Sequence, residues 1–161
     1  MFRKGRKVIY PVYGPGKIVD IFTEEVGEDA VEYFDIEFLN TNLTVSIPVE
    51  EAIEFGLRYP LSEKELKKAL KALDEKVRIS KTLLDDIDEF TSTRFKSGTI
   101  EDAIEVVNQL RRLAQRKLKQ DKKLSAYEMD KLEKAIYFIR SEVHLVMGAT
   151  KADLYDLEII K

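Results

Sequence analysis

Four cations in the C-terminal half of the chain have a spacing that suits phosphate binding. They stand four, three and four residues apart, at Arg112, Arg116, Lys119 and Lys123. On a helix this spacing places all four side chains on one face, opposite an apolar stripe that runs from Ile104 to Leu118. Such a face can bind the backbone of a nucleic acid, because each cation can contact a phosphate. The alternative is a solvated amphipathic helix whose last cations interact favourably with the helix dipole.

Residues that could support catalysis are few. The one histidine, His144, falls in the last predicted long helix, and no second residue at fixed spacing could share a metal ion with it. The chain has no cysteine, which excludes a disulfide, a thiolate ligand and a cysteine nucleophile. The motifs of P-loop nucleotide binding, of α/β-hydrolases and of zinc proteases are absent. We therefore expect no enzymatic activity, no cofactor, no metal ion and no small-molecule substrate.

Charge is distributed unevenly along the 161 residues, although the net charge is only −3. Residues 3–17 contain cations and no acid, whereas residues 18–57 contain acids and no lysine or arginine. A second acidic cluster, Asp85 to Glu89, precedes the cations of the C-terminal half. Local patches, and not the net charge, therefore decide which partners the chain can bind.

Composition is typical of a cytoplasmic globular protein. A hydrophobic content of 44% suffices for a buried core, and the length suits one compact domain or two small ones. No apolar run approaches the roughly 20 residues that span a bilayer. The absence of cysteine fits a reducing cytosol. We expect no membrane contact.

The first 50 residues have the pattern of short strands joined by turns. A strand begins at Lys7, and a second one runs to Phe22 after a turn rich in proline and glycine. A third β-rich stretch covers Val31 to Phe38. The fourth, Leu43 to Pro48, alternates apolar and polar residues with the period of a half-buried strand. Strands this short predict a small curled sheet.

After Tyr59 the pattern becomes helical. Ser62 and Ser125 each precede a glutamate by three residues, the signature of a capping box at a helix start. Two further helices are predicted, one from Ser80 to Lys96 that ends at Gly98, and one that begins at Thr99. The helix from Ser125 should run to Gly148, and a short final helix should begin at Thr150. The fold class is α+β, a small curled N-terminal sheet followed by an all-α helical bundle.

Two blocks of motifs resemble the CarD family of bacterial transcription regulators. The first contains Val8-Ile9-Tyr10-Pro11 with Gly14 and Gly16, then Leu43–Pro48, then Gly56-Leu57-Arg58. The second contains Lys96-Ser97-Gly98 and Leu124-Ser125-Ala126-Tyr127-Glu128. The resemblance covers about residues 2–147, and the N-terminal part is also similar to a module of the transcription-repair coupling factor. It implies a Tudor/SH3-like module at 1–58 that interacts with RNA polymerase, and a helical domain at 59–161.

The resemblance implies that the module binds the β subunit of RNA polymerase through an edge strand. The strand residues are Thr44, Val45, Ser46, Ile47 and Pro48. Ser46 is the side chain expected to face the partner, whereas Val45 and Ile47 can pack in the core, because alternate residues face opposite sides of a strand. Several family members carry an arginine at the position of Ser46, and another at that of Glu24; this chain has neither.

CarD regulators typically insert a tryptophan into the DNA minor groove, and this chain has no tryptophan. Ungapped counting from Gly98 and from Arg58 puts Leu84 at that position. Leucine can also wedge between base steps, but the acids of Asp85 to Glu89 follow it and would repel phosphates. The alternative interpretation makes Leu84 a core residue of its helix.

The first functional hypothesis is a transcription regulator that binds the polymerase β subunit and modulates the stability of the promoter open complex. Its helical domain lies near upstream promoter DNA, with Leu84, Arg112, Arg116, Lys119 and Lys123 as DNA-contacting candidates. The alternative is an adaptor that binds polymerase or another protein and whose helical domain contacts protein instead of DNA. A free-standing RNA-binding barrel is disfavoured, because the strands lack an exposed aromatic platform for stacking bases.

Overall fold

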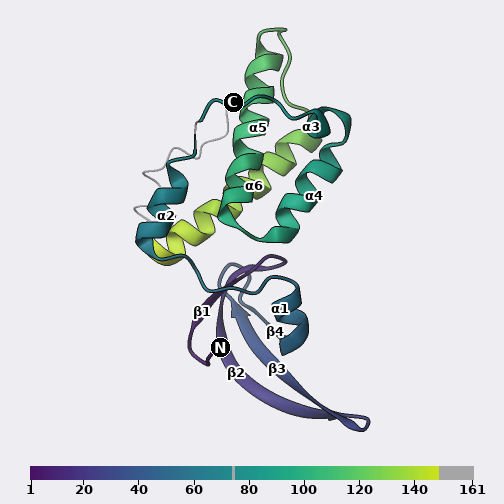
Figure 1. The fold of residues 1–161 in the computed structure, drawn as a ribbon, viewed down its shortest axis with the longest axis vertical. Helices are drawn as coiled ribbons and strands as arrows, with labels where there is room; N and C mark the ends of the chain where they lie inside the picture. Colours follow the sequence, from purple (N-terminus) through teal and green to yellow (C-terminus); the bar gives the residue numbers. More distant parts are fainter. Residues whose placement is uncertain (74, 149–161) are drawn as a thin grey trace. The chain divides into compact units, whose positions relative to one another are not determined.

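The computed structural model describes residues 1–73 and 75–148. It divides the chain into two compact units, Met1–Pro60 and a second unit that begins at Leu61 (Figure 1). The first contains the strands and one short helix, and the second contains the other helices. The predicted fold class, a curled sheet followed by helices, is confirmed.

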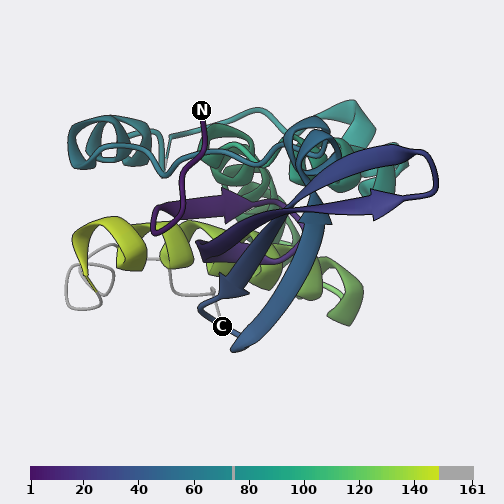
Figure 2. The same cartoon turned by 90° about the horizontal axis from the view of Figure 1, so that it is seen from below.

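The first unit is a four-stranded antiparallel sheet in the order β1-β2-β3-β4. Figure 2 shows its curl. The strands are β1 Lys7–Tyr10, β2 Gly14–Val26, β3 Asp29–Phe38 and β4 Leu43–Pro48. The expected end of the second strand at Phe22 was wrong, because backbone pairing with β3 continues through exposed acidic residues as far as Val26.

A small core fills the concave side of this sheet. Val8, Ile18, Ile36 and Phe38 are fully buried in it. One element was missed from the sequence: a short helix, α1 Val49–Glu54, directly follows β4 and buries Ala52 in the same core. Six residues are too few for a clear helical period, which explains the omission.

After α1, the chain passes beside strand β1 at Arg58. The backbone N–H of Ile9 donates to the carbonyl of Arg58 at 2.8 Å, and the N–H of Arg58 donates to the carbonyl of Ile9 at 3.0 Å. These two bonds occupy part of the outer edge of β1.

The second unit contains five helices among its described residues. They are α2 Glu63–Leu70, α3 Lys81–Asp85, α4 Ile87–Ser97, α5 Ile100–Leu118 and α6 Ala126–Met147. Both predicted capping boxes are confirmed, and Gly98 ends α4 with a φ of 65° that favours glycine. The short helix expected from Thr150 lies outside the described residues.

The single helix expected from Ser80 to Lys96 is two helices. The backbone of Asp86 is extended, with φ −153° and ψ 97°, and its carboxylate accepts a hydrogen bond from the N–H of Glu89. An aspartate that caps the following helix in this way ends the preceding one.

The helical core lies mainly between α5 and α6, which pack on α2 and α4, while α3 packs on α4. Phe90, Leu110, Leu132 and Ile139 have no exposed surface. The expectation that Leu118 completes the apolar stripe was wrong, since its side chain is 60% exposed in the last turn of α5.

Strands β2 and β3 approach each other closely at Gly16, which gives a prediction for the stability of the first unit. A Cβ atom at this position would lie 2.7 Å from Cγ2 of Ile36 and 3.0 Å from the backbone oxygen of Glu37. We expect Gly16→Ala to lower the free energy of unfolding of the first unit by about 1–3 kcal/mol through this overlap. Urea denaturation followed by circular dichroism measures the change. Thr23→Ala, at an exposed position of β2, is the control, and equal stability of the two variants would contradict the prediction.

Candidate functional site

Strand β4 presents one free backbone edge. Its other edge pairs with β3 from Phe38↔Leu43 to Tyr33↔Pro48. No strand of the described residues lies on its outer side, because β4 is the last strand in the sheet order. Alternate backbone N–H and C=O groups of an edge strand point outward and can pair with a strand from another chain.

Side chains of β4 alternate as the sequence predicted from Thr44 to Ile47, whereas Leu43, expected on the apolar face, is 47% exposed. Ile47 is buried and Val45 is half-buried, whereas Thr44 and Ser46 are exposed. The Ser46 hydroxyl donates a hydrogen bond to the carboxylate of Asp35, the residue opposite it on β3. The exposed side chain of Ser46 is therefore already hydrogen-bonded to a carboxylate of its own sheet.

An apolar groove runs beside β4. Its volume is about 370 Å³, and its lining residues are Tyr10, Val12, Tyr13, Val45, Ser46, Ile47, Pro48, Glu51 and Phe55. Three of them are unusually exposed for their type, Val12 at 63%, Phe55 at 51% and Tyr13 at 41%. Contiguous exposed apolar surface next to an open strand edge is typical of a protein-binding site. Burial, together with the nearby Glu51 carboxylate and Tyr13, raises the pKa of Tyr10, which also lines this groove.

In the second unit, Leu84 is 50% exposed and does not belong to the core. Its neighbour Leu83, 4% exposed, packs there instead. The alternative that made Leu84 a core residue was therefore wrong. Both leucines lie in the short helix α3, which ends at Asp85, and in this helix only Leu83 faces the core.

Two of the acids that follow Leu84 have partners within the unit. Asp86 caps α4. Asp88 accepts a hydrogen bond from the Tyr127 hydroxyl, and its carboxylate lies 3.4 Å from the Nζ atom of Lys131. The hydrogen bond from Tyr127, with a smaller contribution from Lys131, lowers the pKa of Asp88. The same hydrogen bond raises the pKa of Tyr127.

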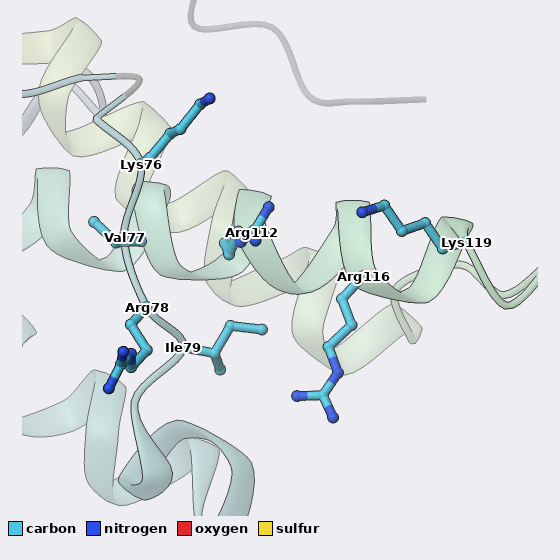
Figure 3. A pocket seen from close by; sticks show the side chains of 7 residues that line it. All are labelled: Lys76, Val77, Arg78, Ile79, Arg112, Arg116 and Lys119. Atoms are coloured by element: carbon cyan, nitrogen blue, oxygen red, sulfur yellow. The ribbon is translucent and has the colours of Figure 1, made fainter.

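Three of the four predicted phosphate-binding cations lie together. Arg112, Arg116 and Lys119 line one open groove on the surface of the helical unit (Figure 3). Lys123 does not lie on the same helical face, because α5 ends at Leu118 and the chain then turns through Asp121, whose φ is 55°. A helical period cannot be extended past the end of the helix.

The sequence reasoning missed two groups of residues at these surfaces. Phe55 and Tyr13 join the groove beside β4, and Lys76 and Arg78 join the groove of Arg112. The alternation Lys76-Val77-Arg78-Ile79 is visible in the sequence. Only the folded chain shows that this stretch lies against α5.

The described residues contain no other arrangement with evident chemistry. His144 is exposed on α6. Across residues 1–73 and 75–148 no group of three or more histidine, aspartate or glutamate side chains could hold a metal ion. In the same part of the chain no helix combines the length and apolarity needed to cross a membrane.

Sequence models of two known domain families match most of the chain. The sequence model of the CarD-like/TRCF RID domain matches residues 2–58. That of the CarD C-terminal domain matches residues 68–157, more than half of the chain. The chain belongs to the CarD family.

A curated CarD-like relative supports the same assignment along its full length. The protein named "Putative transcription factor YdeB" from Bacillus subtilis (strain 168) is 27% identical over 155 residues. The alignment covers 96% of this chain and 97% of the relative. Both matched domains are therefore shared in the same order with a protein described as a transcription factor.

The contact between α4 and α6 near Leu84 gives a pH prediction for this CarD family protein. Tyr127→Phe removes the hydroxyl that donates to Asp88, so we expect the pKa of Asp88 to rise toward the ordinary value of 3.8. A carboxyl group whose pKa is lowered in the folded state stabilises the fold at pH values above its ordinary pKa. The contribution is lost as the pH falls from about 3.8 through the lowered pKa. The stability advantage of the wild type over Tyr127→Phe should therefore disappear in acid.

Carbon-detected NMR titration of the Asp88 carboxyl measures this pKa directly. Tyr137→Phe, at an exposed tyrosine of the same helix, is the matched control and should leave Asp88 unchanged. An Asp88 titration that is identical in the wild type and Tyr127→Phe would contradict the assignment of the hydrogen bond.

Proposed function

We propose that this CarD family protein is a transcription regulator that binds the β subunit of RNA polymerase through its N-terminal module, residues 1–58. The observation that carries the proposal is the unpaired edge of β4 beside an exposed apolar groove. Pairing along Thr44–Pro48 would extend the sheet onto a strand of the polymerase. This role belongs to the cytoplasm, where the polymerase is found.

Backbone pairing explains why the family's arginines can be absent here. Main-chain hydrogen bonds do not depend on side-chain identity. Side chains of the partner that enter the groove would supply specificity. Asp35, whose carboxylate accepts a hydrogen bond from Ser46, and Glu24 give the module carboxylates near positions where other members carry arginine. We infer that the partner surface next to β4 carries complementary cations.

The helical domain is proposed to act near upstream promoter DNA and to change the stability of the open complex. A factor that binds the open state more tightly than the closed state shifts that equilibrium by the difference in affinity. The candidate contacts are Leu84, Arg112, Arg116, Lys119 and Lys123. The exposure of Leu84 supports its candidacy, since a wedge must protrude from the protein surface.

A second candidate function is an adaptor whose helical domain contacts protein. The observation in its favour is the acidic surface around Leu84, where Asp85 and Glu89 are exposed. An exposed leucine among carboxylates suits a basic protein surface better than a phosphate backbone. The two candidates share the polymerase contact and differ only in the partner of the helical domain.

Calorimetric titration with the isolated lobe of the polymerase β subunit tests the shared step. Phe55 is 51% exposed in the groove, so Phe55→Ala should fold normally and yet remove an aromatic anchor. We expect the affinity to fall by at least tenfold, the effect of losing a hot-spot aromatic of about 2 kcal/mol. Leu39→Ala, at a 46% exposed leucine outside the groove, is the control. Wild-type affinity in the Phe55 variant, or no binding by the wild type, would reject docking at this groove.

Open-complex lifetime on promoter DNA tests the candidate wedge. Leu84→Trp should lengthen the lifetime roughly fivefold, for about 1 kcal/mol of added stabilisation of the open state. Because Leu84 is half exposed, the same change should alter the free energy of unfolding by less than about 0.5 kcal/mol. Leu39→Trp provides the matched control for added surface tryptophan. An unchanged lifetime with polymerase binding intact would remove Leu84 from the DNA interface.

A further inference from the structure

The apolar groove beside β4 contains one charged side chain. Of the residues that line it in the described part of the chain, Glu51 is the only acidic or basic one. Glu51 forms no ion pair with any residue of 1–73 and 75–148. A carboxylate beside apolar surface attracts a cation more strongly than one in open water, because the surrounding dielectric constant is lower. The groove therefore offers an unpaired negative charge to whatever binds there.

Helix α1 brings this carboxylate next to an aromatic ring. Glu51 lies in the first turn of α1, and Phe55 caps the C-terminus of the helix. Residues four apart are neighbours on a helix surface, and the N–H of Phe55 donates to the carbonyl of Glu51 at 2.9 Å. Because α1 packs beside β4 (Figure 1), both side chains line the groove along this strand.

Two tyrosines supply further rings. The centroid of the Tyr13 ring lies 4.9 Å from that of Phe38 and 6.0 Å from that of Tyr10. Both neighbours are buried, whereas Tyr13 itself is 41% exposed. The N–H of Tyr13 also donates to the carbonyl of Tyr10 at 3.2 Å. The exposed ring is therefore held in place before a partner arrives, which lowers the entropy cost of binding.

The negative charge of Glu51 lies close to these rings. Burial raises the pKa of Tyr10 most, and the Glu51 carboxylate and Tyr13 raise it further. A carboxylate disfavours ionisation of a phenol in this way only when the two groups are near each other. The carboxylate and the aromatic side chains thus form one surface.

A strand that pairs with the outer edge of β4 would direct alternate side chains to this surface. Val45 and Ile47 lie on the inner face of β4 and line the groove. Directly opposed residues of neighbouring strands have their side chains on the same face. A partner residue opposite Val45 or Ile47 would therefore place its side chain over the groove. The residues on either side of it would lie on the other face, with Ser46.

An arginine side chain matches this combination of groups. Its guanidinium is planar, stacks on aromatic rings and can donate two parallel hydrogen bonds to a carboxylate. A lysine ammonium is more strongly hydrated and lacks this fork. An apolar side chain would leave Glu51 unpaired in a desolvated groove, and an acid would be repelled. The volume of about 370 Å³ is at the small end for a ligand pocket, which suits a single side chain.

We propose that Glu51 selects an arginine side chain of the partner strand, which enters the groove beside the rings of Tyr13 and Phe55. The proposal rests on the proposed docking of the first unit on the polymerase and names the residue that determines its specificity. Backbone pairing along β4 is compatible with many partner sequences. A charge that only one kind of side chain can satisfy makes the choice among them.

The experiment is calorimetric titration of the full chain with the isolated lobe of the polymerase β subunit. Glu51→Gln keeps the shape of the side chain and removes its charge. We expect the affinity to fall about tenfold, the effect of losing a charge-assisted contact at an interface. Glu54→Gln makes the same change at an exposed position of α1 outside the groove. This control should bind like the wild type, and both variants should unfold at the wild-type urea concentration.

A double-mutant cycle identifies the arginine on the lobe. Each surface arginine of the lobe is replaced in turn by methionine, which has a similar length and no charge. One replacement should weaken binding to the wild type by about tenfold and binding to Glu51→Gln by less than about twofold, because the two groups act as a pair. Lysine in place of the same arginine should not restore the full affinity.

Four outcomes would overturn the inference. The first is wild-type affinity in Glu51→Gln while Phe55→Ala is weakened, which would leave docking at the groove intact. The second is an equal loss in Glu51→Gln and Glu54→Gln, which would indicate only a general attraction between charges. The third is additivity of Glu51→Gln with every arginine replacement, or full affinity with lysine. The fourth, no binding of the wild type to the lobe, would also reject the proposed function, so the two failures are distinguishable.

Discussion

Backbone groups that regular secondary structure leaves unpaired determine both candidate functional surfaces of this CarD family protein. A backbone N–H or C=O must find a partner in the protein, in water or in another molecule. In the first unit, Arg58 pairs with Ile9 on the outer side of β1, while no strand of residues 1–73 and 75–148 lies along the outer edge of β4. In the second unit, the side chain of Gln109 pairs with the irregular segment at Arg78 and Ser80. The first arrangement leaves an edge for a partner strand, and the second fixes two cations beside α5.

The residues around Leu84 show how one backbone break changes the chemistry of a surface. Asp86 ends α3 and begins α4, and in the short helix α3 Leu83 is buried while Leu84 is exposed. The same break assigns Asp86 to a cap, and the fold gives Asp88 the Tyr127 hydroxyl as a donor. The carboxylate of Asp88, one of the acids that follow Leu84 in the sequence, therefore takes part in the contact between α4 and α6. The exposed acids that remain are Asp85 and Glu89.

The two units differ in the kind of surface that each exposes. The β-module offers hydrogen bonds and apolar surface, which suit a protein partner, and it has no lysine or arginine between residues 18 and 57. The helical unit gathers its cations in one groove, which suits a polyanion.

The sequence alone determined what depends on neighbouring residues. The capping boxes at Ser62 and Ser125, the glycine stop at Gly98 and the alternation of β4 were all predictable, because caps, turns and strand faces are set within a few residues. The tertiary structure decided the rest: the break at Asp86, the end of α5 before Lys123, and the addition of Lys76 and Arg78 to the groove of Arg112. These features depend on contacts between residues about 30 or more apart, or on competition between a cap and a continuing helix. A local pattern does not encode the distant contacts, and a local cap signal such as that of Asp86 does not show by itself whether the cap or the continuing helix prevails.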